Sequence, residues 1–415
     1  MWVERDQREK AVIVGSEEDG SLDELAALVE SAGGRVMARM VLRRAQPDPA
    51  FFLTAGKLGE LKGLVSTEGA VLVVFDDELS PVQARNLEEE LAVKIIDRTE
   101  LILDIFAQRA RTKEAKLQVE KGQLEYLLPR LTGKGVILSR LAGGIGTRGP
   151  GETKLEADRQ RIRARIAVLN RRLRQVKANR RLQRAPRRRL SWPVLALVGY
   201  TNAGKSTLFR LLTGADVGVE DRLFTTLDPT IRRLTFPNQL ETLIIDTVGL
   251  IRKLPHQLVE AFRATLEELY EADLLIHVVN LASPYRDEEY MAGRQLLREL
   301  GLEDKPSITV LNKVDLVENE FTVFRAVRTY PQAVAISART GAGVEELKDK
   351  VVAMLSAHVD RGAFFIPFTE GGYLSLLHEK GKVYTQEYRD SGVYLEVELP
   401  RVWAERLRQF RVSGD

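Results

Sequence analysis

The sequence predicts an α/β protein in four parts: a small α/β domain, a long helical hairpin, a larger central α/β domain and a small C-terminal α/β domain. Three observations support this prediction. Short apolar runs alternate with helical periodicity through the first hundred residues. Two helical patterns then flank a glycine-rich stretch at 141–156. Finally, an apolar strand, a glycine loop and a helix follow one another at 194–213.

The first domain shows four strand signals, at 11–15, 35–42, 70–75 and 92–97. Between them, helical patterns cover 21–34, 56–69 and 80–91, and the first of these ends on the glycine pair at 33–34. Apolar strands that alternate with helices predict a sheet covered by helices.

Composition excludes several classes of protein. The chain has 415 residues, of which 44% are hydrophobic and 29% are charged, as expected of a globular protein. It lacks an apolar run long enough to span a bilayer, and its charged N-terminus is unlike a signal peptide. Because there is no cysteine, disulfides, thiolate metal sites and cysteine nucleophiles are excluded. We expect a cytoplasmic protein.

The hairpin prediction depends on one apolar seam and one concentration of charge. Helical periodicity covers 98–131, and a second helix carries a heptad seam of Ile162, Ile166, Leu169, Leu173 and Val176. Residues 157–190 contain fourteen Arg or Lys and one acid, a net +13 in a chain whose total is +3. Such a basic segment on an otherwise acidic chain favours a polyanion, and RNA in particular. We interpret 184–193 as a linker.

The glycine-rich stretch contains the spacing G-x-G-x-x-G at Gly144, Gly146 and Gly149. A dinucleotide site would need an acidic residue about 20 residues later, and none occurs between 159 and 190. We therefore predict no dinucleotide site. Glycines permit close backbone approach, and beside Arg148 and Lys154 they favour contact with an RNA backbone at the tip of the hairpin. The predicted RNA contacts are Arg148, Lys154, Arg161, Arg165, Arg172 and Arg180.

The segment Gly199–Ser206 matches the phosphate-loop pattern G-x-x-x-x-G-K-[ST] between an apolar strand and a helix. Backbone N–H groups and the helix N-terminus would hold phosphates, while Lys205 would reach the β and γ oxygens. Ser206 would ligate Mg²⁺.

Three further motifs specify the nucleotide. Asp246 ends an apolar strand and is followed by Gly249 in a D-x-x-G arrangement. In this arrangement the aspartate contacts the groups that bind Mg²⁺ without binding the ion directly, and the glycine N–H senses the γ-phosphate. Residues 312–315 read N-K-x-D, whose carboxylate accepts from both donors of the guanine edge. Residues 337–339 read S-A-R and end a strand in a loop that is suited to binding the guanine carbonyl. The four motifs together predict a GTPase.

Catalysis is predicted to depend on Lys205, Thr226 and Gly249. The segment "LFTTLDPT" should be mobile, and Thr226, chosen over Thr225, should reach Mg²⁺ when the γ-phosphate is present. Leu250 occupies the position of the water-orienting glutamine of Ras-like GTPases, so intrinsic hydrolysis should be slow. Help would come from K⁺ near Asn202 or from a partner; alternatively, Asn202 only stabilises its own loop.

We assign 1–105 to an N-terminal α/β domain, 106–190 to the helical hairpin with its glycine-rich tip and basic linker, 191–358 to the P-loop GTPase domain, and 359–415 to a C-terminal α/β domain. His277, in an apolar strand, is predicted to be a core residue.

The sequence resembles the HflX family of ribosome-associated GTPases over nearly its whole length, through motifs such as "GGIGTRGPGET", "GYTNAGKSTLF", "TTLDPT" and "DTVGLIRKLPHQLVEAFRATLEE". The resemblance implies binding to the large ribosomal subunit and GTP-dependent splitting or rescue of ribosomes, often under stress. It implies Mg²⁺ ligands at Ser206 and Thr226. The implied GTP contacts are Gly199, Tyr200, Thr201, Asn202, Ala203, Gly204, Lys205, Ser206, Thr207, Phe224, Thr225, Thr226, Leu227, Asp228, Asp246, Thr247, Val248, Gly249, Asn312, Lys313, Val314, Asp315, Ser337, Ala338 and Arg339.

Two other functions fit the same motifs. The protein could be a GTPase that assembles the large subunit, or a nucleotide-gated RNA-binding scaffold in which hydrolysis is incidental. In each case we expect a monomer whose partners are the ribosome, its large subunit and ribosomal RNA. We expect no stable membrane insertion and a cytoplasmic location, with partial peripheral membrane attachment as the alternative.

Overall fold

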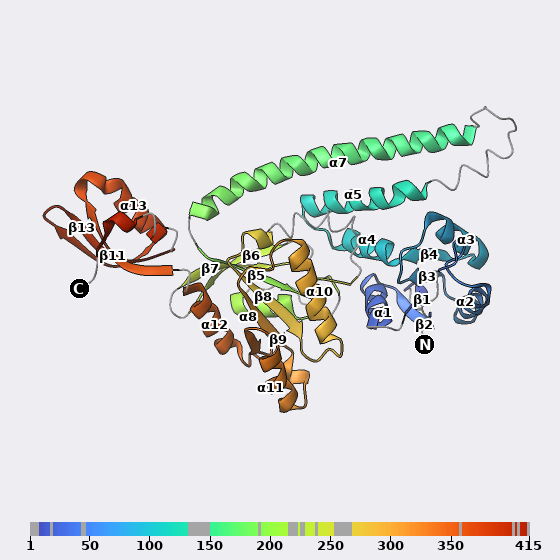
Figure 1. Cartoon of the computed structure of the whole chain (residues 1–415). Helices are drawn as coiled ribbons and strands as arrows, with labels where there is room; N and C mark the ends of the chain where they lie inside the picture. The colour runs from blue at the N-terminus through green and yellow to red at the C-terminus, as the bar shows by residue number, and fades with distance from the viewer. Residues whose placement is uncertain are drawn as a thin grey trace, which may run out of the picture.

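The computed structural model describes residues 8–16, 20–42, 47–131, 150–189, 192–214, 223–224, 229–236, 240–252, 268–356, 359–400, 403–404 and 407–412. Figure 1 shows three sheets and one long helical hairpin. The predicted fold class is confirmed: a parallel α/β sheet, the hairpin, a central GTPase sheet and a small C-terminal antiparallel sheet follow one another along the chain.

The N-terminal unit is a parallel sheet with helices on both faces. Its strands, in the order β2-β1-β3-β4, are β1 (Lys10–Gly15), β2 (Arg35–Val41), β3 (Leu72–Phe75) and β4 (Lys94–Asp97). Its helices are α1 (Ser21–Ser31), α2 (Ala55–Glu68), α3 (Pro81–Leu91) and α4 (Arg98–Arg109). Alternate residues of β1 and β3 pack on α1 and α4 on one face and on α2 and α3 on the other. Both faces are buried, which explains the continuous apolar runs in the sequence.

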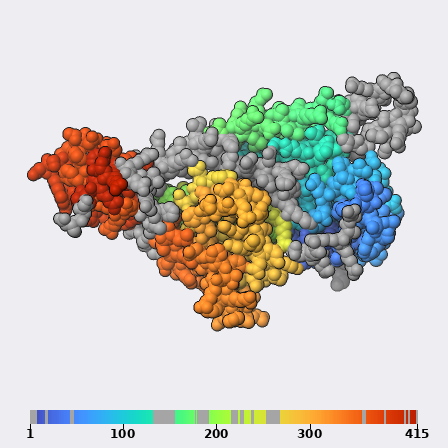
Figure 2. Space-filling view, viewed as in Figure 1, coloured from blue at the N-terminus to red at the C-terminus, as the bar shows by residue number. Residues whose placement is uncertain are grey.

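The hairpin consists of α5 (Lys113–Arg130) and the 40-residue α7 (Pro150–Arg189), which run antiparallel in Figure 1. The heptad seam is confirmed: Leu169 is fully buried, and the other four seam residues are less exposed than the arginines around them. The helical stretch at 98–131 is interrupted, because Thr112 caps a new helix three residues after α4 ends. Figure 2 shows the hairpin along one edge of the molecule.

The prediction of a linker at 184–193 is wrong in its first part. Helix α7 continues to Arg189, so four residues remain before the first strand of the central sheet, β5 (Val194–Gly199). The helix therefore includes Pro186, although proline is the weakest helix former.

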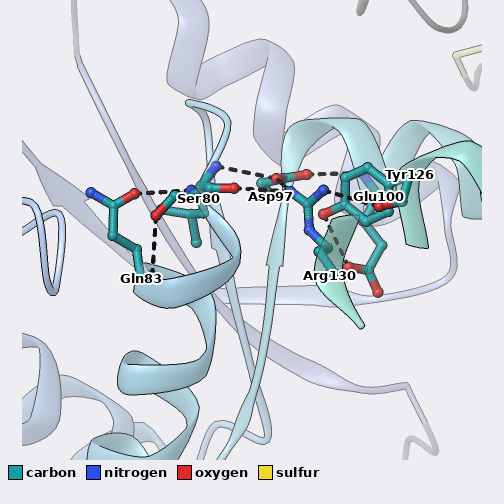
Figure 3. Close-up of polar contacts among 7 residues, drawn as sticks. Ser80, Gln83, Asp97, Glu100, Tyr126 and Arg130 are labelled. Carbon is teal, nitrogen blue, oxygen red and sulfur yellow. Dashed lines mark hydrogen bonds and ion pairs between the residues drawn. The ribbon is translucent and has the colours of Figure 1, made fainter. Parts of the chain in front are cut away.

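A polar network fixes the end of α5 to the N-terminal unit (Figure 3). Asp97, at the end of β4, accepts from Arg130 Nη2 at 2.8 Å and from the backbone N–H groups of Leu79 and Glu100. The guanidinium of Arg130 also lies 3.4 Å from the centre of the Tyr126 ring. Because Arg130 is the last residue of α5, this network fixes that end of the helix to the N-terminal unit.

The central sheet has six strands in the order β10-β9-β8-β5-β7-β6, all parallel except β6. The strands besides β5 are β6 (Thr230–Thr235), β7 (Glu241–Asp246), β8 (Leu274–Asn280), β9 (Ser307–Asn312) and β10 (Ala333–Ala335). The helices are α8 (Lys205–Thr213), α10 (Arg286–Glu299), α11 (Glu320–Thr329) and α12 (Val344–Ser356), and the 3₁₀ turn η2 spans Val314–Leu316. Strands β5, β7 and β9 are parallel and end at Gly199, Asp246 and Asn312, so the predicted nucleotide motifs lie along the same edge of the sheet.

The C-terminal unit is an antiparallel sheet in the order β12-β13-β11-β14. Its elements are β11 (Val359–Pro367), the 3₁₀ turn η3 (Phe368–Glu370), α13 (Gly371–Lys380), β12 (Lys382–Arg389), β13 (Gly392–Pro400), η4 (Arg408–Phe410) and β14 (Arg411–Val412). One face of β11 and β13 packs on α13. In Figure 1 this unit lies at the far end of the molecule from the N-terminal unit.

Candidate nucleotide site

Two glycines of the predicted phosphate loop lie directly against neighbouring strands. Gly199 (φ 146°) lies against the carbonyl of Val278 and Gly204 (φ 93°) against the Asn312 side chain, so a Cβ at either position would collide. Lys205 Nζ donates to the carbonyl oxygens of Gly199 and Tyr200 at 3.0 and 2.8 Å, across the loop. Burial lowers the pKa of Lys205 to about 8, and the carboxylate of Asp246 opposes this shift.

Two of the three predicted magnesium residues, Ser206 and Asp246, lie together. Ser206 Oγ donates to Asp246 Oδ2 at 2.8 Å, where α8 begins and β7 ends. A hydroxyl and a carboxylate oxygen beside a phosphate loop are the hard donors that Mg²⁺ uses with nucleotide phosphates, so these residues fit the ion. Within the described part of the chain there is no cluster of three His, Asp or Glu that could hold a metal by itself. Thr226 lies outside the described residues.

The segment 249–252, which we call the second switch segment, lies directly on the phosphate loop. Leu250 N–H donates to the carbonyl of Gly199 at 3.0 Å, and Thr201 N–H donates to the carbonyl of Leu250 at 2.8 Å. A Cβ on Gly249 would stand 2.7 Å from Thr201 Cγ2 and 3.1 Å from Lys205 Nζ. A glycine is therefore required here, and its backbone faces the same space as the lysine ammonium.

At the predicted guanine end of the site, three motifs meet through side-chain hydrogen bonds. Asn312 donates to the carbonyl of Ala203 at 2.8 Å and accepts the N–H of Ala338 at 2.9 Å, so it joins the phosphate loop to the S-A-R loop. Ser337 Oγ donates to Asp315 Oδ1 at 2.6 Å. These bonds hold the carboxylate at the edge where β9 and β10 end.

Two positively charged side chains, those of Arg339 and Lys313, contact polar oxygens of this site. Exposed Arg339 pairs with Asp315 Oδ2 at 2.8 Å. Lys313, in the left-handed conformation, donates from Nζ to Asn202 Oδ1 at 3.2 Å. The amide oxygen that we considered for K⁺ therefore already accepts from an ammonium group, which K⁺ would have to replace.

Sequence reasoning missed how closely the N-terminal unit holds this site. Leu223 N–H donates to Ser31 Oγ at 3.0 Å, and the buried Phe224 packs edge-on against Phe106 with ring centres 4.6 Å apart. Apolar residues of the two units form one continuous core. The only signal in the sequence was an apolar pair, Leu223–Phe224, at the start of a segment expected to be mobile.

Comparison with known proteins assigns the family. Residues 19–107 match a family model described as GTP-binding GTPase N-terminal, 109–187 match GTP-binding GTPase Middle Region, and 194–313 match 50S ribosome-binding GTPase. The chain is 46% identical over 403 residues to GTPase HflX of Caldanaerobacter subterraneus subsp. tengcongensis, covering 97% of this chain and 93% of that protein. The chain belongs to the HflX GTPase family.

A second relative and a solved structure are also similar to this chain. GTPase HflX of Escherichia coli is 42% identical over 414 residues, covering 98% of this chain and 97% of that protein. Among solved structures, the crystal structure of SsGBP and GDP complex matches with a TM-score of 0.49 and 27% identity, covering 84% of this chain and 99% of that chain.

The structure describes only some of the remaining predicted contacts of this HflX GTPase. Thr247 and Val248 are buried, and Thr247 Oγ1 donates to the carbonyl of Leu197 at 2.6 Å. Thr207 lies in the first turn of α8. Val314 starts η2. The predicted contacts Thr225, Thr226, Leu227 and Asp228 lie outside the described residues.

The basic face of the hairpin is only partly available to a polyanion. Arg161 and Arg172 are exposed. Arg165, also exposed, pairs with Glu120 of α5 at 2.6 Å and so joins the two helices, and Arg161 pairs with Asp158 of its own helix at 3.0 Å. Arg148 lies outside the described residues, as do the side chains of Lys154 and Arg180. Within the described residues, no helix has the length and apolar character needed to cross a bilayer.

Proposed function

We propose that this HflX GTPase binds the large ribosomal subunit through its basic hairpin and couples GTP binding and hydrolysis to ribosome splitting or rescue. One observation carries the proposal: basic helix α7 ends at Arg189, four residues before β5, and β5 ends in the phosphate loop. A helix bound to RNA would thus be joined to the nucleotide site by a short connection.

The chemistry that we assign to the site follows from its charges. The Lys205 ammonium would neutralise β- and γ-phosphate oxygens, and backbone N–H groups of 199–206 would hold the phosphates. Ser206 and Thr226 would hold Mg²⁺, with Asp246 supporting them, and the bound ion would supply positive charge that neutralises the phosphates. Asp315 would accept from the guanine edge.

The slow intrinsic rate of GTP hydrolysis that we expect follows from Leu250. A leucine side chain has no group that orients water, so we expect an isolated rate on the order of 10⁻⁴ to 10⁻³ s⁻¹, as for an unassisted small GTPase. If Asn202 holds K⁺ during hydrolysis, then K⁺ should raise the rate more than Na⁺ at equal ionic strength. Equal hydrolysis rates in K⁺ and Na⁺ would mean that Asn202 has only a structural role, through its hydrogen bond with Lys313.

The test is sedimentation of mature 70S ribosomes incubated with the protein and either GTP or GDP, alongside the GTPase rate with and without ribosomes. We expect free subunits with GTP and a ribosome-stimulated rate. Intact 70S particles, together with large-subunit precursors in cells that lack the protein, would favour the assembly function. A rate unaffected by any ribosomal particle would favour the scaffold function.

A further inference from the structure

The side chain of Tyr200 connects three parts of the molecule. Its hydroxyl donates to Glu24 Oε1, on α1 of the N-terminal unit, at 2.6 Å. The same oxygen accepts the backbone N–H of Arg252, in the second switch segment, at 2.7 Å. Tyr200 itself belongs to the phosphate loop, and its side chain is buried.

Glu24 is a fixed acceptor. Its Oε2 pairs with Arg98 Nη2 at 2.8 Å, and Arg98 Nη1 pairs with Asp76 Oδ1 at 2.7 Å. Ser21 Oγ donates to the other oxygen of Asp76 at 2.6 Å. Arg98 and Asp76 are almost completely buried, so the position of the carboxylate is set by the fold of the N-terminal unit.

This arrangement determines the direction of the phenol. A carboxylate only accepts, so the single hydroxyl proton of Tyr200 points to Glu24, and a lone pair remains for Arg252 N–H. Burial, and then the charge of Glu24, raise the pKa of Tyr200, so the proton stays in place at working pH. The two hydrogen bonds therefore support each other.

The position of Arg252 bears on the γ-phosphate. Leu250 is held by the phosphate-loop backbone, and Arg252 by the Tyr200 hydroxyl, so the second switch segment is fixed at two points. Gly249, just before them, lies beside Lys205. Releasing Arg252 would free the segment that presents the Gly249 N–H.

We propose that Tyr200 is a positioning residue for GTP hydrolysis: its hydroxyl, oriented by Glu24, holds the second switch segment in the position from which Gly249 meets the γ-phosphate. This inference rests on the nucleotide site proposed above. The contacts of Leu223 and Phe224 with Ser31 and Phe106 support it independently, because they dock the other nucleotide-sensing segment on the same unit.

Tyr200→Phe tests the inference, because it removes the hydroxyl and keeps the ring. Affinity for GMPPNP and the rate at saturating GTP should each fall by about threefold to tenfold, the worth of one net hydrogen bond. GDP, which has no γ-phosphate, should lose less than twofold. Glu24→Gln should shift the GMPPNP-to-GDP affinity ratio in the same direction, and the double variant should show less than the product of the two effects.

The matched control is Tyr330→Phe, which removes another buried phenol that donates to a carboxylate, Asp287, away from the phosphate loop. It should leave the GMPPNP-to-GDP ratio unchanged. If Tyr200→Phe leaves both the ratio and the rate unchanged, or weakens both nucleotides equally, the hydroxyl is only structural and the inference fails. Lys205→Ala separates this failure from that of the site itself, because it should weaken both nucleotides if the phosphate loop binds them.

Discussion

At the scale of single residues, Lys205 shows how burial makes nucleotide binding sensitive to pH. Desolvation lowers the pKa of its ammonium group to about 8 in the absence of nucleotide. Bound phosphates would raise that pKa again, since an opposite charge favours the charged form. Binding is therefore fully favoured below the free pKa and weakens as pH rises through it.

We predict that GTP affinity falls by about fourfold between pH 7 and pH 8.5, following the protonated fraction of a lysine with this pKa. The measurement is a fluorescent-nucleotide titration across that range, with the free energy of unfolding followed in parallel to exclude loss of fold. An affinity that stays constant to pH 8.5 would show that the Lys205 ammonium is not discharged in the free protein.

Residues whose role depends on backbone geometry were predictable from the sequence. Gly199, Gly204 and Gly249 each occupy a place where a Cβ would collide, and the spacing of the motif encodes that requirement. The roles of Tyr200 and Phe224 were not predictable. Tyr200 bonds to Glu24 across 176 positions of the chain, and no local pattern records such a pair.

At the scale of elements, the ion pair between Arg130 and Asp97 positions the end of α5. Arg130→Met would leave a buried carboxylate without its cation, which costs about 3 kcal/mol of unfolding free energy. Asp97→Asn in the same chain should recover part of that loss. Chemical denaturation, followed by a probe in the N-terminal unit, measures both.

The control for this prediction is Arg161→Met. It breaks an exposed pair with Asp158 on α7, and exposed pairs contribute little. If Arg130→Met destabilises the protein no more than this control does, the network in Figure 3 does not anchor the hairpin.

For helix α7, the hydrophobic periodicity predicted the buried face correctly, whereas the composition of 184–193 led to a wrong prediction of where the helix ends. The heptad seam of α7 was predicted because burial on one face leaves a regular pattern. The end of α7 was misplaced because Pro186 and the arginine run looked like a linker. Proline disfavours a helix interior, so local propensity predicts an end near Pro186, and only the structure places the end at Arg189.

The basic face of α7 gives a second prediction at this scale. Changing Arg161, Arg172 and Arg174, all exposed, to Glu should weaken ribosome binding and lower the slope of log affinity against log salt by about 2 to 3, for three lost phosphate contacts. Arg165 is left unchanged because it pairs with Glu120. GTP binding should persist, since none of the predicted nucleotide contacts lies in α7.

A matched control reverses three exposed arginines of the central unit, Arg298, Arg325 and Arg328, for the same change in net charge. This variant should keep the salt slope. If the α7 variant binds ribosomes like the parent, or if the control is equally impaired, the basic face is a solvated surface and the RNA contact lies elsewhere.

At the scale of the whole molecule, the N-terminal unit, the hairpin and the central unit form one connected structure. The N-terminal and central units share a core. Leu223 and Phe224 contact α1 and α4, and the second switch segment is linked to α1 through Tyr200. Helix α7 leads from the hairpin towards β5. Nucleotide-dependent movement of residues 223–224 or of the second switch segment would therefore disturb the unit to which the hairpin is anchored.

Co-sedimentation of the full chain with 70S ribosomes and with separated subunits, in GMPPNP and in GDP, tests most directly whether this GTPase couples its nucleotide to ribosome binding. We expect the protein to pellet with the large subunit and with 70S ribosomes in GMPPNP, and to remain largely in the supernatant in GDP. Equal pelleting in the two nucleotides, or none in either, would contradict the proposal that this GTPase couples its nucleotide to ribosome binding.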